Sequence, residues 1–236
     1  MRVVSLVPSL TEAVAVSAPG LLVGATAWCS HPPDLDVRRV AGTKNPDVEA
    51  VIALAPDLVL ANEEENRAVD LDALRAAGLD VDVTRIRTVA EGLAELRRVL
   101  GRLGTAPAWL DEAERVWAVP HTVPHDGPRR RAVVPIWRRP WMAVGSDTFT
   151  GDLLGRLGVD NVLADSPERY PRFDPDALPP HDLVVLPDEP YAFDADDGPE
   201  AFAAPSRCVS GRHLTWYGPS LVEARELLTA QLAPPG

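Results

Sequence analysis

Two short apolar runs constrain the fold of this chain more than any other feature of its sequence. Residues 58–61 are Leu-Val-Leu-Ala and residues 183–186 are Leu-Val-Val-Leu, and an aspartate precedes each run. A strand with one face in water alternates apolar and polar residues, whereas a strand of a parallel sheet covered by helices on both faces is apolar throughout. The two runs therefore predict parallel sheets with helices on both sides.

Strand and helix patterns alternate along the chain. Strand-like runs occupy residues 3–7, 22–25, 57–61, 80–84, 131–136, 182–186 and 207–209, and helical patterns occupy 47–54, 69–77, 88–103, 108–119, 148–157 and 220–232. A further helix follows the first strand, with Ser9 predicted as its N-cap and Glu12 as the partner in a capping box. Such alternation is typical of α/β folds.

The alternation restarts after residue 128, which predicts two Rossmann-like α/β lobes, each with a central parallel sheet. We predict an N-terminal lobe over residues 1–104, a connecting helix and loop over 105–128, and a C-terminal lobe over 129–236. Pro107 and Pro120 bound the connecting helix, because proline is favoured at the first position of a helix and ends one that has begun.

Charge and composition exclude several classes of partner. The 236-residue chain carries a net charge of −12, and a nucleic-acid-binding protein normally needs a basic face. No run approaches the roughly 20 apolar residues of a membrane helix, so we predict no membrane insertion. The sequence as given has no recognisable targeting segment, which predicts a cytoplasmic protein, or a periplasmic or extracellular one if a leader was removed.

Polar and aromatic residues follow most of the predicted strands. Ligands of open parallel sheets bind beyond the carboxyl ends of the strands, so these residues are candidates for ligand contact. With Lys44 as an additional cation, the predicted ligand-binding residues are Ser9, Trp28, Lys44, Asn62, Glu64, Asn66, Trp137, Arg138, Arg139, Trp141, Tyr191, Trp216 and Tyr217.

The run Trp137-Arg138-Arg139-Pro140-Trp141 is the most informative of these segments. Its indoles can wall a site for a large flat or apolar ligand, and its guanidinium groups can pair with the carboxylates or phosphates of that ligand. The run also fits a second interpretation, in which the tryptophans belong to the core and the arginines lie on the surface.

Cys29 and His31 offer a thiol and an imidazole two residues apart. Together with His213 they are tentative metal ligands. Alternatively, Cys29 is a nucleophile with His31 as its base, or Cys29 is a buried structural cysteine. The acidic segments 63–65 and 188–189 offer a similar choice between binding a cation or a basic partner and lying in solvated loops.

Several segments together resemble a known family. The opening residues 2–12, Arg-Val-Val-Ser-Leu-Val-Pro-Ser-Leu-Thr-Glu, and the element at 51–60, Val-Ile-Ala-Leu-Ala-Pro-Asp-Leu-Val-Leu, resemble the class III substrate-binding proteins of ABC importers, the helical backbone metal receptors. Segments 42–47, 62–67, 135–141 and 214–219 are similar to a cobalamin-binding-like subgroup. The resemblance implies two lobes, a rigid connecting helix and a cleft between the lobes for a metal chelate.

The residues and the resemblance together predict a non-catalytic binding protein for a metal-containing chelate. Cobalamin or another corrinoid is the first choice of ligand, and a ferric siderophore or haem is the next. No cofactor is required, and an ABC permease is a possible partner. Two alternatives stay open: an enzyme on the same fold that uses Cys29 and His31 or a bound metal, and a module that binds a metal ion directly or docks a protein.

Overall fold

The computed structural model describes residues 1–118 and 129–234, and the chain divides into two compact units. Unit 1 comprises Met1–Ile86, Glu91–Ala113 and Tyr217–Pro219, and unit 2 comprises Arg87–Ala90, Glu114–Trp216 and Ser220–Gly236. The domain limits at residues 104 and 129 stay a prediction. Residues 119–128 of the predicted connecting segment lie outside the described residues.

Unit 1 contains a five-stranded parallel sheet with the strand order β3-β2-β1-β4-β5. Its strands are β1 (Val3–Ser5), β2 (Leu22–Ala25), β3 (Arg38–Arg39), β4 (Leu58–Asn62) and β5 (Val81–Thr84). Its helices are α1 (Pro8–Ser17), α2 (Val48–Ala53), α3 (Ala68–Ala76) and the larger parts of α4 (Val89–Arg102) and α5 (Ala108–Ala118).

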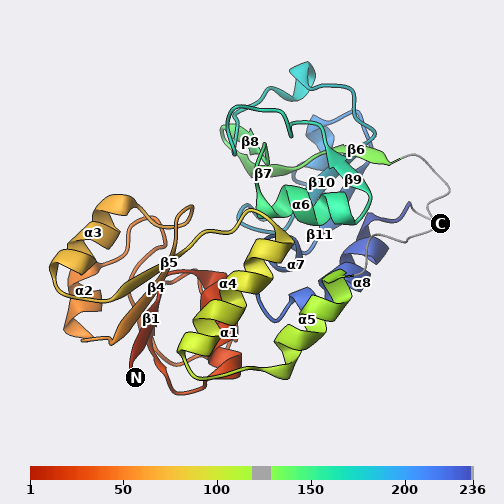
Figure 1. Ribbon diagram of the computed structural model, residues 1–236. Coiled ribbons are helices and arrows are strands. Elements are labelled where there is room, and N and C mark those ends of the chain that lie inside the picture. The colour runs from red at the N-terminus through yellow and green to blue at the C-terminus, as the bar shows by residue number, and fades with distance from the viewer. Residues whose placement is uncertain (119–128, 235–236) are drawn as a thin grey trace. The chain divides into compact units, whose positions relative to one another are not determined.

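The apolar run of β4 is buried on both faces of this sheet. All five residues of β4 are buried. Val59 and Ala61 pack in one cluster with Val51 of α2 and Leu74 of α3. Successive side chains of a strand point to opposite faces, and helices α1 and α4 lie on the other side of the sheet (Figure 1). The predicted parallel sheet with helices on both sides is confirmed.

Unit 2 contains a four-stranded parallel sheet and an antiparallel hairpin. The sheet has the order β11-β10-β6-β9, formed by β6 (Arg130–Val133), β9 (Val159–Asn161), β10 (Leu183–Pro187) and β11 (Ser206–Val209). The hairpin pairs β7 (Pro135–Arg138) with β8 (Trp141–Ala143). The helices are α6 (Phe149–Arg156), α7 (Gly211–Thr215) and α8 (Leu221–Leu232), with 3₁₀ turns at Pro175–Ala177 and Pro199–Ala201.

Each sheet reverses its direction of growth at one point. In unit 1 the chain adds β2 on one side of β1 and later β4 on the other. In unit 2 it adds β9 on one side of β6 and later β10 on the other. Connections that leave in opposite directions open a crevice at the carboxyl ends of the two central strands, and ligands of such folds bind there. These two edges are therefore where functional side chains belong.

Two local predictions are wrong. Ser9 is not the N-cap of α1: Val7 is the cap residue, Pro8 occupies the first turn, and Ser9 is buried inside the helix. Proline at the first helical position has no N–H to leave unpaired, so Pro8 sets the start of the helix. The predicted strand 131–136 divides at Val134, where the chain leaves the parallel sheet and enters the β7–β8 hairpin.

Among the described residues, no helix combines the length and the apolar character that a crossing of the lipid bilayer requires.

A buried carboxylate secures the outer edge of the unit 1 sheet. The Asp82 side chain in β5 is 6% exposed and accepts hydrogen bonds from Arg98 at 2.7 and 2.8 Å and from Arg102 at 3.0 Å. These bonds, led by those from Arg98, hold the pKa of Asp82 below its ordinary value of 3.8. The folded state therefore favours the charged carboxylate.

We expect Asp82→Asn to destabilise the protein at neutral pH by about 1–2 kcal/mol, because charge-assisted hydrogen bonds are lost and the arginines stay half exposed. A lowered pKa contributes stability above the ordinary value of 3.8 that is lost as the pH falls through the folded value. The difference between wild type and variant should therefore shrink in acid. Urea titrations at neutral pH and near the ordinary pKa measure both effects.

The exposed pair of Asp72 and Arg75, 3.0 Å apart on α3, provides the control. Asp72→Asn should change the urea midpoint little at either pH. An Asp82→Asn variant as stable as this control at neutral pH would contradict the role of Asp82.

Candidate functional site

The loops at the switch point of unit 1 are held together by one buried asparagine. Asn66 Nδ2 donates to Leu6 O at 3.2 Å and to Thr43 O at 3.0 Å, and Asn66 Oδ1 accepts from Asn62 N at 2.9 Å. Three stretches of backbone, after β1, before α2 and at the end of β4, therefore meet at one side chain. The ligand contact predicted for Asn66 stays a prediction, and the structure shows its amide hydrogen-bonded to the backbone.

Asn62 extends this network to the next strand. Its Nδ2 lies 3.1 Å from Thr84 Oγ1 at the end of β5, and its Oδ1 accepts from Glu64 N at 2.8 Å. The side chain is buried, and its amide groups are engaged by the protein itself. Asn62 therefore shapes the turn that presents residues 63–65.

Two exposed side chains stand on this edge of unit 1. Trp28 follows β2 and is 64% exposed, with its indole nitrogen beside Gly42. Lys44 donates from Nζ to the backbone oxygen of Glu64, so the cation is fixed over the acidic turn. Burial raises the pKa of the neighbouring Glu65, and the charge of Lys44 partly offsets this. An apolar face and a cation thus belong to the same set of loops.

Cys29 is a buried thiol. Its Sγ lies 3.0 Å from Thr11 Oγ1 and 3.1 Å from Thr26 Oγ1, and burial raises its pKa above 9.0. A thiol with a raised pKa is protonated at neutral pH and is a poor nucleophile. The Nδ1 of His31 instead lies 3.1 Å from Ser30 Oγ. Burial favours the structural interpretation of Cys29 over the nucleophilic one.

The switch point of unit 2 carries an aromatic pair. Trp137 stands on the hairpin that follows β6 and is 41% exposed, and Tyr191 follows β10, the neighbour of β6. Their rings meet edge to face with centroids 5.7 Å apart. The Tyr191 hydroxyl donates to Asp197 Oδ2 at 2.6 Å, which fixes the ring under Trp137.

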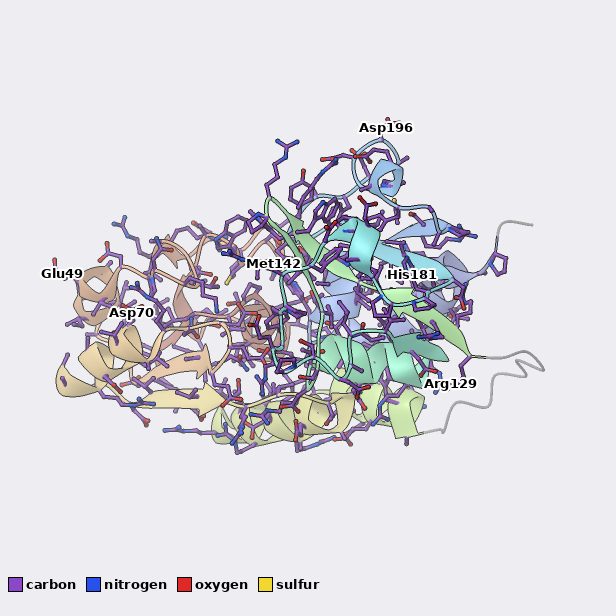
Figure 2. The ribbon with its side chains drawn as sticks, turned by 90° about the horizontal axis from the view of Figure 1, so that it is seen from above. Glu49, Asp70, Arg129, Met142, His181 and Asp196 are labelled. Carbon is purple, nitrogen blue, oxygen red and sulfur yellow. The ribbon has the colours of Figure 1, made fainter. Side chains whose placement is uncertain are left out.

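Further aromatic side chains support this pair from below. Phe193 lies 4.6 Å from Tyr191 and stacks on Trp141 at 5.9 Å with an interplanar angle of 3°. Trp141 also meets Phe202 and Phe173. Trp141 therefore packs against the unit 2 core, as the second interpretation of segment 137–141 expects, whereas Trp137 is exposed and its role as a wall for a ligand stays a prediction. Met142, which follows Trp141 in strand β8 of the hairpin, is labelled in Figure 2.

The two arginines between these tryptophans differ in their surroundings. Arg138 lies over the Trp141 ring at 5.4 Å and forms ion pairs with Asp197 and Glu200. These acids already neutralise its charge. Arg139 is exposed at the tip of the hairpin. The arginine available to a ligand at this tip is therefore Arg139.

The segment before α8 is buried. Trp216 and Tyr217 are each 6% exposed. The imidazole of His213 is engaged on both sides, with Nδ1 2.7 Å from Ser210 Oγ and Nε2 2.9 Å from Glu223 Oε1. The hydrogen bond from His213 lowers the pKa of Glu223. These contacts join α7 to α8 and leave neither imidazole nitrogen open to a metal ion.

The structure sorts the predicted site residues by exposure. Exposed side chains are Trp28, Lys44, Trp137 and Arg139; half-buried ones are His31, Glu64, Arg138, Trp141 and Tyr191; and buried ones are Ser9, Cys29, Asn62, Asn66, His213, Trp216 and Tyr217. In the part of the chain that the structure describes, no three histidine, cysteine or acidic side chains gather as a metal site. The tentative ligand set Cys29, His31 and His213 stays a prediction.

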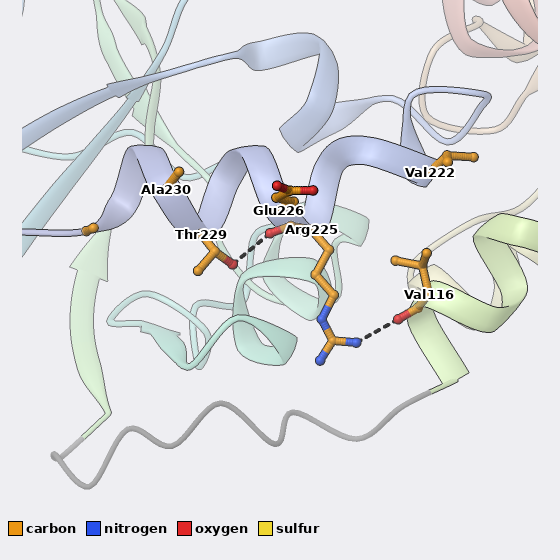
Figure 3. Close-up of a pocket in the computed structure, with 7 residues that line it drawn as sticks. Val116, Val222, Arg225, Glu226, Thr229 and Ala230 are labelled. Carbon is orange, nitrogen blue, oxygen red and sulfur yellow. Dashed lines mark hydrogen bonds between the residues drawn. The ribbon is translucent and has the colours of Figure 1, made fainter.

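A shallow groove of about 530 Å³ lies along α8 and contains none of the predicted site residues. Its lining consists of Val116, Val222, Arg225, Glu226, Thr229, Ala230 and Ala233, and the Arg225 guanidinium donates to Val116 O at 2.6 Å (Figure 3). The guanidinium group of Arg225 is thus already hydrogen-bonded within the protein.

The supporting phenylalanines were not predicted from the sequence. Phe173, Phe193 and Phe202 lie in the proline-rich stretch 167–205, outside its one strand-like run at residues 182–186. Their common signal is composition: three of the four phenylalanines of the chain fall in this loop-rich stretch. Apolar rings in long loops indicate a core beneath them.

Comparison with known proteins agrees with this architecture. The family model for periplasmic binding protein matches residues 3–179. The cobalamin-binding protein of Halobacterium salinarum is 30% identical over 235 residues, which cover 94% of this chain and 62% of that protein. The periplasmic haem-binding protein RhuT of Roseiflexus sp. RS-1 superposes with a TM-score of 0.82 at 19% identity, covering 98% and 97% of the two chains.

A second solved structure has the same fold. The periplasmic vitamin B12 binding protein BtuF of Vibrio cholerae superposes with a TM-score of 0.75 at 18% identity, covering 98% of this chain and 96% of that one. The chain spans 62% of the length of its Halobacterium relative. The match over three quarters of its length places the chain in the periplasmic binding protein family. The family and fold expected from the sequence are confirmed.

We expect Asn66→Ala to destabilise the protein by about 2–3 kcal/mol, because one buried carbonyl, one partly buried carbonyl and one buried N–H lose their partner. Asn45→Ala, an exposed asparagine in a neighbouring loop, should stay within about 0.5 kcal/mol of wild type. Chemical denaturation of both variants measures the difference. Equal stability of the two would contradict the positioning role of Asn66.

We expect the folded protein to react with a thiol reagent at Cys208, which is exposed, and at Cys29 only after unfolding. Partial desolvation of the thiol and the nearby carboxylates of Asp194 and Asp188 raise the pKa of Cys208, so its reaction should accelerate with alkaline pH. Counting modified thiols by mass, with Cys208→Ser as the control, tests this. Rapid labelling of Cys29 in the native protein would contradict its burial.

Proposed function

We propose that this protein is a non-catalytic receptor for a metal-containing chelate, with cobalamin or another corrinoid as the first candidate and haem or a ferric siderophore as the next. The observation that carries the proposal is the exposed indole of Trp137 at the switch point of unit 2, held edge to face on Tyr191. The relatives of this chain include cobalamin-binding and haem-binding proteins.

The aromatic support explains how such a surface binds a large ring system. A ligand with a wide apolar face gains most from burying aromatic surface that is already ordered, because little side-chain entropy is then lost. Trp137 is ordered by Tyr191, and Tyr191 by Phe193 and Asp197. The indole of Trp137 therefore offers a pre-organised wall.

Unit 1 carries an exposed indole and a cation at its own switch point. Trp28 is exposed beside Gly42, and Lys44 is fixed by the backbone of Glu64. Lys44 and Arg139 supply positive charge to acidic substituents of the chelate, in a chain whose net charge is −12. We assign the ligand contacts to Trp28, Lys44, Trp137, Arg139 and Tyr191, and positioning roles to Asn62 and Asn66.

The burial of Cys29, the nucleophile that the sequence suggested, favours binding over catalysis. The thiol of Cys29 is buried and its pKa is raised, so it is not activated for attack. The protein requires no cofactor of its own under this proposal, and the chelate is cargo. An ABC permease is the partner that fits a receptor of this family, and the periplasm or the cell exterior is the compartment that fits such a partner.

Titration with cyanocobalamin, haem and ferrichrome tests the proposal, with calorimetry and tryptophan fluorescence as the readouts. We expect saturable binding of one of them at a stoichiometry of one. Trp137→Ala and Trp28→Ala should each weaken it at least about tenfold, because each removes a central aromatic anchor.

Trp109→Ala is the matched control. The Trp109 indole donates to Ser17 Oγ at 2.9 Å, at the end of α1 that is remote from the carboxyl edge of the sheet. This variant should bind like wild type. No saturable binding of any of the three chelates would refute the proposed function, and equal effects of all three tryptophan variants would refute the assigned site.

A further inference from the structure

Arg138 joins two segments of unit 2 that are distant in the sequence. It is on β7, directly after Trp137, and its guanidinium group forms ion pairs with Asp197 and with Glu200. Both acids lie in the loop that follows β10. The Arg138 side chain is 19% exposed, whereas Asp197 is 39% and Glu200 is 50% exposed, so the cation is the most covered member of the group.

Asp197 divides its two carboxylate oxygens between Arg138 and Tyr191. Its Oδ1 pairs with the guanidinium group, and its Oδ2 accepts from the Tyr191 hydroxyl at 2.6 Å. The Tyr191 ring in turn meets the Trp137 indole edge to face. Because Trp137 and Arg138 are consecutive residues of one strand, these contacts form a closed cycle that runs from the indole through Arg138, Asp197 and Tyr191 back to the indole.

The loop that supplies Asp197 is fixed by its own contacts. Asp194 Oδ1 accepts from the N–H groups of Asp196 and Asp197, both at 2.8 Å, and Asp194 N donates to Asp197 O at 3.2 Å. Gly198 follows with a φ of +130°, and a Cβ at this position would lie 2.8 Å from Phe193 Cδ1. The loop therefore lies directly against the aromatic core, which holds the Asp197 carboxylate in place.

An aromatic ring holds the guanidinium group of Arg138 from another direction. Arg138 pairs with Trp141 across the β7–β8 hairpin, and its Cζ lies 5.4 Å from the centroid of the Trp141 ring. Trp141 is itself stacked on Phe193. A guanidinium group is planar and can lie on a ring while its edge binds carboxylates, which an ammonium group cannot do.

We propose that Arg138 is a positioning residue of the ligand site: through Asp197 it fixes Tyr191, and with Tyr191 the indole of Trp137. The inference rests on the proposed function and names the residue that sets the geometry of the aromatic wall in unit 2. Arg138 acts on the chelate only through this indole, and the acidic substituents of the chelate are left to Arg139.

The cycle of contacts has a direct consequence for affinity. An exposed side chain that moves among rotamers must be ordered when a ligand binds, and each such side chain lowers the affinity. Without the guanidinium group, Asp197 and Glu200 lose their shared cation, and like charges repel each other. Tyr191 then loses its fixed acceptor, and Trp137 loses the ring that orders it.

Fluorine NMR of protein labelled with 5-fluorotryptophan tests the inference without a ligand. Trp137→Phe assigns the resonance of Trp137 among those of the six tryptophans. We expect Arg138→Lys, Arg138→Gln and Asp197→Ala to shift or broaden this resonance, because the indole loses its fixed contact with the Tyr191 ring. Tyr191→Phe keeps the ring, removes the hydroxyl and should act in the same direction. Thermal unfolding verifies that each variant is folded.

Binding of haem and haem dimethyl ester, which differ in their carboxylates, separates positioning from ligand contact. Arg138→Gln should weaken the binding of both by about three- to tenfold, the effect of one unordered side chain, and leave the ratio of the two affinities unchanged. Arg139→Gln should weaken haem and leave the ester unchanged. In a Trp137→Ala background, Arg138→Gln should have no further effect, because the two residues act as a unit. Weakening of haem alone by Arg138→Gln would make Arg138 a ligand contact and overturn the inference.

Arg129 provides the matched control. It precedes β6 at the amino edge of the same sheet, pairs with Asp160 at 2.7 Å, and lies well apart from Met142 of the hairpin in Figure 2. Arg129→Gln makes the same charge change as Arg138→Gln and should leave the Trp137 resonance and both affinities unchanged. Equal effects of the two variants would reduce the result to overall charge and would overturn the positioning role.

The outcomes separate this inference from the proposed function. If no chelate binds but the Trp137 resonance responds to the variants as described, the positioning role stands and the chelate function fails. If haem binds and the Trp137 resonance is the same in wild type and in all the Arg138, Asp197 and Tyr191 variants, the chelate function stands and the positioning role is wrong. A loss of global stability alone does not move the resonance of a protein that is still folded.

Discussion

Burial of both faces of each parallel sheet is the constraint on which the rest of this structure depends. Because β4 and β10 are buried along their whole length, helices and loops must cover the sheets, and the faces are closed to ligands. Chemistry is confined to the ends of the strands. At the carboxyl ends, backbone groups that no longer pair within the sheet need partners, and Asn66 supplies them in unit 1.

The two units use different residue types to fix the exposed side chains at the carboxyl edges of their sheets. Unit 1 uses amide side chains, with Asn62 and Asn66 fixing loops on which Trp28 and Lys44 stand. Unit 2 uses aromatic rings, with Phe193 and Tyr191 fixing Trp137. In both units, buried or half-buried side chains fix the position of a few exposed ones.

The sheets and most helices could be predicted from the sequence because the residue patterns that indicate them lie within each strand or helix. The apolar runs of β4 and β10, and the helical patterns that begin at Asp47 and Thr148, are legible without tertiary structure. The two-residue strand β3 and the division of residues 131–136 depend on pairing with distant strands, which no local pattern contains. For the site, position after a strand identified Trp28 and Trp137 but could not separate them from Asn66 or Trp216, since burial is decided by packing.

Neither unit is a continuous length of chain. Unit 1 takes Tyr217–Pro219 from near the C-terminus, and unit 2 takes Arg87–Ala90 from between β5 and α4. No single cut in the gene would therefore yield one complete unit. During synthesis, the five strands of unit 1 emerge long before Tyr217–Pro219, so unit 1 completes its contacts only after the strands of unit 2 have been made.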